Sequence, residues 1–299
     1  MSDRSASGRW LVFGAAFFWG TSATLARYVF RDRHVPPLTA VELRLLLAAA
    51  MLGPWLAWKR PEALRVDRRD WKYFVILGLF GLAAVQGSYY YSISVLGVGL
   101  AILIQYIAPT LVVLYGLTRG EKVSRTTAVA LIAALLGTIL LVGGVNPASV
   151  HARPYQWLIS FVSAFAFAFY VIYSKRGLSR YSPETVLFYT FCIAGLFWAI
   201  VTPPWNVLGA GYSAGMWGIF VALAIFSTLV PFELFYAGLH RLPVAQAGIV
   251  ATLEPVIAVL SAALVLRETL NPVQSLGAAL VVMASMLATR KPAAPPPAA

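Results

Sequence analysis

Long apolar stretches separated by short polar segments follow one another along almost the whole chain. A helix needs about 20 apolar residues to cross the hydrocarbon core of a bilayer. Prolines and charged runs, such as Pro36-Pro37 and Lys59-Arg60-Pro61, mark the breaks between stretches. The pattern predicts ten membrane-spanning helices, over residues 11–30, 38–58, 73–94, 98–117, 126–144, 156–174, 185–202, 215–238, 244–265 and 272–289.

The composition agrees with this pattern. Of the 299 residues, 60% are hydrophobic and only 11% are charged, and the mean hydropathy is +0.77. A soluble domain carries about 25% charged residues. One soluble core cannot bury so much apolar surface, so we expect an all-α integral membrane protein that has the lipid bilayer as its solvent.

The net charge of +12 is explained better by membrane orientation than by nucleic acid, because the basic residues lie between the apolar stretches. With the N-terminus inside, 17 of the 23 Lys and Arg residues lie on the inner side and 4 on the outer side, and Arg27 and Arg44 lie within spans. Positive residues accumulate on the cytosolic side of membrane proteins. Both termini are therefore expected in the cytosol.

The chain repeats itself. The segment GVGLAILIQYIAPTLVVL, from Gly97, is echoed by PVAQAGIVATLEPVIAVL, from Pro243, and Pro109 falls on Pro255. Each half holds five spans, and since five is odd the second half enters the membrane with opposite polarity. We therefore expect a cytosolic tail (1–10), a first five-helix repeat (11–145), a second, inverted repeat (146–289) and a disordered Pro/Ala-rich tail (290–299). Inverted repeats are the usual architecture of secondary transporters, which bind substrate between the halves.

Several short elements occur in the order and at the spacing seen in one family. They are Trp19-Gly20, Arg44 within RLLLAAA, Pro109 followed by Gly120-Glu121, and Glu254-Pro255 followed by Arg267-Glu268. In these elements the chain resembles the drug/metabolite transporter superfamily, specifically its ten-helix EamA-type members. The match departs from the family at Arg267, where family members often have glycine. The resemblance therefore does not fix the residue at which that helix ends.

The resemblance implies a basket of ten helices around a central cavity. Spans 1, 3, 4, 6, 8 and 9 would line the cavity, spans 5 and 10 would be peripheral, and transport would follow alternating access. Among family members the chain is similar to the YddG-type aromatic amino acid exporters of bacterial inner membranes, and that membrane is the expected location.

Ionisable groups inside spans are costly and so face a cavity or a partner. Glu254 is the strongest candidate, because Pro255 frees a backbone carbonyl one turn earlier and polar groups gather at such a point. It could hold a substrate ammonium or take up a proton, or it could only bond a neighbouring helix. Near the outer end of span 2, Glu42 and Arg44 fit interfacial anchoring or a structural bond to another helix. Near the outer end of span 1, Arg27 fits snorkelling to the interface, with attraction of a carboxylate as the alternative.

Aromatic side chains with polar tips occupy matched positions of the two halves, and such walls suit small amphipathic solutes. The residues expected to bind substrate are Trp19, Gln86, Tyr90, Gln105, Tyr106, Tyr170, Tyr173, Tyr236 and Glu254. The residues expected in gating or structural roles are Pro109, Pro231, Glu233 and Pro255.

These features favour a secondary transporter that exports amino acids, including aromatic ones. A transporter of another small metabolite or drug is the open alternative. A membrane enzyme would need paired acid and base groups, whereas His34, His151 and His240 are scattered. We therefore expect no catalytic residues, no metal and no cofactor, no nucleic-acid partner, and a monomer.

Overall fold

The computed structural model describes residues 2–31, 33–142, 152–266 and 270–288, and all regular structure within these ranges is helical. The elements of the first half are α1 (Ser2–Arg31), α2 (Pro37–Lys59), η1 (Pro61–Leu64), η2 (Arg68–Asp70), α3 (Trp71–Ile76), η3 (Leu77–Ala83), α4 (Ala84–Leu96), α5 (Val98–Gln105), α6 (Ala108–Thr118) and α7 (Arg125–Leu141). Those of the second half are α8 (Pro154–Gly177), α9 (Pro183–Val201), α10 (Pro204–Gly209), α11 (Ala214–Ala224), η5 (Ile225–Leu229), α12 (Val230–Arg241), α13 (Val244–Ala251), α14 (Leu253–Leu266) and α15 (Pro272–Ala288).

Seven helical stretches of the described residues are long and apolar enough to cross a membrane. They coincide with seven of the ten predicted spans, so the chain is a multi-span membrane protein. The other three predicted spans coincide with α1 and with the 17-residue helices α7 and α15. The count of ten spans and the inverted repeat stay predictions. The predicted boundary near residue 146 and the tail 290–299 lie outside the described residues, and α1 begins at Ser2, within the predicted tail.

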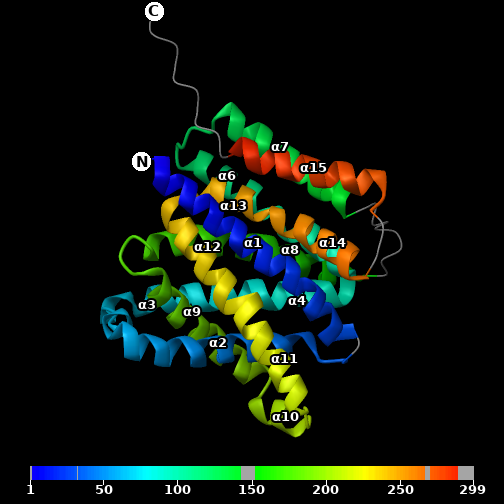
Figure 1. Cartoon of the computed structure of the whole chain (residues 1–299). Helices are drawn as coiled ribbons and strands as arrows, with labels where there is room; N and C mark the ends of the chain where they lie inside the picture. Colours follow the sequence, from blue (N-terminus) through cyan, green and yellow to red (C-terminus); the bar gives the residue numbers. More distant parts are fainter. Residues whose placement is uncertain (1, 32, 143–151, 267–269, 289–299) are drawn as a thin grey trace, which may run out of the picture.

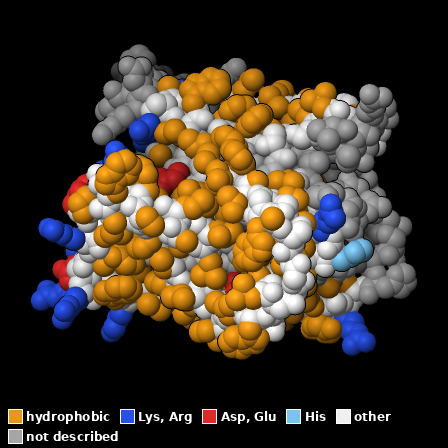
Figure 2. Space-filling view, turned by 60° about the horizontal axis from the view of Figure 1, so that its bottom comes forward, with side chains coloured by type: hydrophobic (Ala, Val, Ile, Leu, Met, Phe, Trp, Pro, Cys, Tyr) orange, Lys and Arg blue, Asp and Glu red, His pale blue; other side chains and the backbone are white. Residues whose placement is uncertain are grey.

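Helices distant in the sequence pack side by side (Figure 1). Helix α1 lies against α12 and α14, α2 lies against α9, and α4 lies against α8. Helices α7 and α15 pair with each other at one edge of the molecule. Figure 2 shows apolar side chains over most of one face, with Lys and Arg toward its edges. This distribution suits a protein whose sides contact lipid and whose ends contact water.

Proline and serine fix where many helices begin. Pro37, Pro154, Pro183 and Pro272 occupy the first turns of their helices, where a missing N–H costs no hydrogen bond. The Ser124 hydroxyl accepts the N–H of Thr127 at the start of α7, and other N-cap side chains act in the same way before α9 and α11.

Two of the spanning stretches contain π-helical segments, η3 and η5. The offset of 146 residues that pairs Pro109 with Pro255 maps η3 onto residues 223–229, which include all of η5. A π segment holds more residues per turn than an α-helix and is frequent at functional sites. Each segment therefore rotates the side chains that follow it relative to those that precede it.

The contact between α7 and α15 depends on glycine. A Cβ atom at Gly277 would lie 2.4 Å from the backbone nitrogen of Leu141, and one at Gly137 would lie 2.8 Å from the carbonyl oxygen of Gly277. Small residues let helix backbones approach closely in membranes.

We predict that Gly277→Ala destabilises the protein, because the added methyl group forces α7 and α15 apart at a cost of about 1–3 kcal/mol. The measurement is the apparent melting temperature in detergent. Gly218→Ala is the matched control, since a Cβ there meets nothing within 4 Å. Equal melting temperatures for the two variants would contradict the assignment of this contact.

Candidate functional site

A cavity lies between the two halves and is lined by both. Its empty volume, open mouth included, is about 870 Å³. It is lined by Trp19 and Ser22 of α1, Arg44 of α2, Val85, Gln86, Tyr89, Tyr90 and Ile93 of α4, Val98 and Gln105 of α5, Phe167 and Tyr170 of α8, Ser227 of η5, Phe232 of α12 and Glu254 of α14.

Two broken helices meet beside this cavity. The helical stretch Val98–Thr118 breaks at Tyr106, between α5 and α6. The corresponding stretch of the second half, which begins at Val244, breaks at Thr252, between α13 and α14. These positions are 146 residues apart, the same offset that pairs Pro109 with Pro255. Discontinuous helices at corresponding places in two repeats are a pointer to a transporter's binding site, because their free backbone groups can bind solutes.

Pro255 creates one of the polar positions beside the cavity. Because proline has no N–H, the carbonyl of Ala251, four residues earlier, loses its normal helical partner. The Tyr106 hydroxyl lies 3.0 Å from this carbonyl oxygen and 2.7 Å from Oε2 of Glu254. Tyr106 thus joins the break of one half to the break of the other. Oε1 of Glu254 makes no hydrogen bond to any residue that the structure describes, so it is free for a ligand.

Pro231 creates a second position in the same way. It frees the carbonyl of Ser227, which accepts a hydrogen bond from Nη2 of Arg44 at 3.1 Å. Nε of Arg44 donates to Oγ1 of Thr228 at 2.8 Å, and the guanidinium carbon lies 5.1 Å from the ring centroid of Tyr90. Nη1 has no hydrogen-bond partner among the described residues, so Arg44 keeps donors for a ligand while it holds α2 against η5.

Aromatic rings form much of the remaining wall. Trp19 meets Phe232 edge to face, with ring centroids 5.2 Å apart, and Tyr170 meets Phe232 in the same manner. Near these rings, Oε1 of Gln105 and Oγ of Ser227 are buried and have no hydrogen-bond partner among the described residues. Buried polar atoms are nearly always paired, so unpaired ones beside a cavity suggest a bound solute or water.

The expected substrate-binding residues divide into two groups. Six of them lie on the cavity wall: Trp19, Gln86, Tyr90, Gln105, Tyr170 and Glu254. Tyr106 lies behind Glu254. Tyr236 is fully buried and shares a hydrogen bond with Ser174 at 2.7 Å, and Tyr173 stacks on Tyr73 at another hollow.

The residues expected in gating or structural roles lie around the site. Pro255 and Pro231 free the two carbonyls described above. Pro109 lies against Gly248, where a Cβ would be 3.5 Å from its ring, so α6 and α13 touch at the break. Oε1 of Glu233 is buried without a hydrogen-bond partner in the described part of the chain.

Sequence reasoning interpreted two polar residues of α2 as structural. Glu42 does accept a hydrogen bond from the Thr202 hydroxyl, at 2.7 Å. Arg44 makes structural bonds too, but it also lines the cavity, which sequence reasoning missed. Pro231, four residues after Ser227, could have indicated a freed carbonyl, but nothing in the sequence joins that carbonyl to Arg44. The side chains of Arg27 and Arg267-Glu268 lie outside the described part of the chain.

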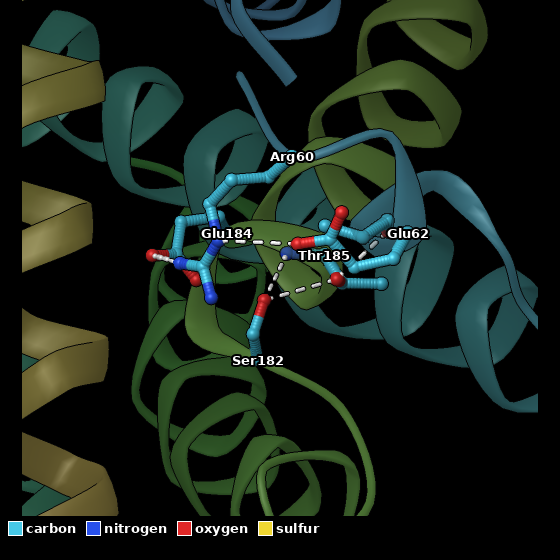
Figure 3. Close-up of polar contacts among 6 residues, drawn as sticks. Arg60, Glu62, Ser182, Glu184 and Thr185 are labelled. Atoms are coloured by element: carbon cyan, nitrogen blue, oxygen red, sulfur yellow. Dashed lines mark hydrogen bonds and ion pairs between the residues drawn. The ribbon is translucent and has the colours of Figure 1, made fainter. Parts of the chain in front are cut away.

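Beyond the cavity, polar contacts join the segment after α2 to the start of α9 (Figure 3). Nη1 of Arg60 lies 2.8 Å from Oε1 of Glu184. Ser182 accepts the N–H of Thr185 as an N-cap, and the Thr185 hydroxyl donates to the carbonyl of Ala63 at 2.8 Å. These bonds close the end of the molecule at which α2 finishes and α9 begins.

The same closure includes Asp70. Nη1 of Arg180 lies 2.8 Å from one carboxylate oxygen of Asp70, and the Tyr181 hydroxyl donates to the other at 2.6 Å. Burial, followed by the hydrogen bond to Asp70, raises the pKa of Tyr181. The phenol therefore stays protonated and remains a donor at neutral pH.

The comparisons with known proteins agree with this geometry. A model of the EamA-like transporter family matches residues 6–143 and again 155–290. The chain belongs to the EamA-like transporter family. It is therefore a transporter of the drug/metabolite transporter superfamily. In the described part of this EamA-like chain, no three His, Cys, Asp or Glu residues gather as metal ligands would.

Similar proteins cover nearly the whole chain. The threonine/homoserine exporter RhtA of Escherichia coli (strain K12) is 28% identical over 270 residues, which are 89% of this chain and 86% of RhtA. The uncharacterized inner membrane transporter YicL of Salmonella typhimurium is 25% identical over 278 residues, which are 91% of this chain and 92% of YicL. A crystal structure that is 21% identical superimposes with a TM-score of 0.77 over 95% of this chain and 96% of its own, and shows the fold alone. The resemblance to YddG-type exporters stays a prediction.

We predict that Tyr106→Phe destabilises this EamA-like transporter. The change leaves the Ala251 carbonyl and Oε2 of Glu254 without their shared donor, at a cost of about 1–3 kcal/mol. The readout is the melting temperature in detergent, and the control is Tyr115→Phe, at an exposed tyrosine. If Tyr106→Phe and the control have the same melting temperature, Tyr106 does not satisfy the freed carbonyl.

Proposed function

We propose that this transporter exports amino acids, including aromatic ones, across a bacterial inner membrane by alternating access. The observation that carries the proposal is the presence of one cation and one anion on the same cavity wall. Among the described lining residues, Arg44 is the one cation and Glu254 is the one anion. An α-amino acid carries a carboxylate and an ammonium on one carbon, and the two wall charges complement them.

Each wall charge has free capacity for its part of the ligand. Arg44 uses Nε and one bond of Nη2 within the protein, which leaves Nη1 for a substrate carboxylate. Glu254 uses Oε2, which leaves Oε1 for a substrate ammonium. Hydrogen bonds to charged groups contribute about 1.5–3 kcal/mol each, so both ends of the zwitterion would add substantially to affinity.

The aromatic wall supports a substrate with an apolar side chain. Trp19, Phe167, Tyr170 and Phe232 surround the space beside the two charges. The relative RhtA, named as a threonine/homoserine exporter, supports amino acids as the substrate class.

Alternating access is supported by the matched breaks and by the closed end of the molecule. If the termini are cytosolic, as the Lys and Arg distribution predicts, the contacts of Arg60 and Asp70 close the cytosolic side. Val98 and Ile93, on the cavity wall, then lie near the outer ends of their spans. This conformation would present the cavity to the outside, after release of an exported solute.

Another small metabolite or drug is the alternative substrate. A multiply charged anion such as a sugar phosphate would require several basic groups inside the membrane, whereas Arg44 is the single basic residue among the described side chains that line the cavity. An uncharged drug would need the aromatic wall but neither charge.

Counterflow in proteoliposomes tests the proposal. Preloading the vesicles with unlabelled amino acids should accelerate uptake of labelled phenylalanine. The reason is that the carrier can then turn outward with an unlabelled amino acid bound and exchange it for a labelled one. Vesicles loaded with sugars or phosphates should give no acceleration. Uptake driven equally by every load, or by none with the protein shown folded, would favour the metabolite or drug alternative.

We also predict that Glu254→Gln lowers phenylalanine counterflow about tenfold or more, because the charge-assisted bond to the substrate ammonium is lost. The amide oxygen can still accept from Tyr106, so folding is kept. Glu121→Gln, at an exposed residue outside both the cavity and the closure around Arg60 and Asp70, is the control and should transport normally. Unchanged counterflow with Glu254→Gln would remove Glu254 from substrate binding.

A further inference from the structure

A second hollow, separate from the central cavity, lies where α3 meets the end of α8. Its empty volume, mouth included, is about 510 Å³. The stacked rings of Tyr73 and Tyr173, with centroids 5.0 Å apart, form part of its wall. The Tyr73 hydroxyl is buried there and has no hydrogen-bond partner among the described residues.

The hollow is strongly basic. Arg69, Lys72, Arg176 and Arg180 line it, together with one acidic residue, Asp70. Asp70 is already occupied, because both of its oxygens are bonded to Arg180 and Tyr181. Arg69, Lys72 and Arg176 have no ion pair within the described residues. Three cations around one hollow form a site for an anion.

The helices on either side of the hollow carry exposed apolar residues. On α8, Leu158 is 69% exposed and Phe165 is 61% exposed. These residues lie five and three helical turns before Arg176, and so on the same face. After Lys72, Val75 and Phe80 are exposed in the same way. On α8 the exposed apolar residues end at Phe165, three turns before Arg176, whereas on the other side they begin at Val75, one turn after Lys72. The basic hollow therefore borders an exposed apolar surface on its α3 side, as a site for a lipid headgroup would.

We propose that this hollow binds the phosphate of an anionic phospholipid, with the acyl chains along the exposed surface of α3 and η3. Basic pockets between helices on the cytosolic side suit such headgroups, and the Lys and Arg distribution places this end in the cytosol. A bound phosphate would bridge η2 and α3 to the end of α8, across the closure formed by Asp70, Arg180 and Tyr181. The site is independent of the transported solute.

The test is the affinity of the purified full-length protein for dioleoylphosphatidylglycerol, measured by native mass spectrometry against dioleoylphosphatidylcholine, which has the same chains and no net charge. The phosphatidylglycerol should bind at least tenfold more tightly. The double variant Lys72→Gln/Arg176→Gln should lose about tenfold or more of that affinity, since each basic residue near an anionic surface contributes to attraction. The charge-conserving pair Lys72→Arg/Arg176→Lys should retain it.

The matched control is Arg65→Gln/Arg68→Gln, which removes the same charge from exposed residues outside the hollow. An equal loss in the control would show diffuse attraction and overturn the proposal. Inorganic phosphate at millimolar concentration should compete weakly. Competition as strong as that of the lipid would identify a site for soluble anions, and equal affinity for the two lipids would also overturn the proposal.

Discussion

A backbone carbonyl that loses its helical partner inside a membrane must find another donor, and this constraint organises the centre of the transporter. No water is present in the hydrocarbon core to satisfy such a group, and each unsatisfied group costs several kcal/mol. Pro255 and Pro231 free the carbonyls of Ala251 and Ser227, and Tyr106 and Arg44 bond them from the other half of the chain. The bonds that satisfy the backbone are therefore also the bonds that join the two halves.

The same bonds place the chemistry of the site. Arg44 is held at the cavity by the Ser227 carbonyl and the Thr228 hydroxyl, with donors remaining for a ligand. Glu254 is oriented by Tyr106 and keeps one oxygen free. If Arg44 binds substrate as proposed, stability and binding share this residue, because its removal would also leave the Ser227 carbonyl without its donor. Charge-neutralising changes that keep the hydrogen bond, such as Glu254→Gln, separate the two effects.

The sequence was sufficient to predict the helices, the repetition of the two halves and a polar position at Glu254 beside Pro255, since apolar run length and proline chemistry act locally. A role of Glu254 in transport stays a prediction. It was insufficient to predict which tyrosines face the cavity. The π segment η3 precedes Tyr90 and shifts the rotation of α4, so a 100° step counted from α3 does not give its direction. Tyr236 and Tyr173 turn away from the cavity because of packing between α8, α12 and α3, which no local pattern encodes.

The measurement that tests the central claim most directly is binding of three matched ligands to the purified transporter. Phenylalanine carries both charges, phenylalaninamide lacks the carboxylate, and 3-phenylpropionate lacks the ammonium. If Arg44 and Glu254 together recognise a zwitterion, phenylalanine should bind about tenfold or more tightly than either analogue, because each analogue loses one charge-assisted hydrogen bond. Equal affinity for all three would contradict the account and would leave only the aromatic wall as the basis of recognition.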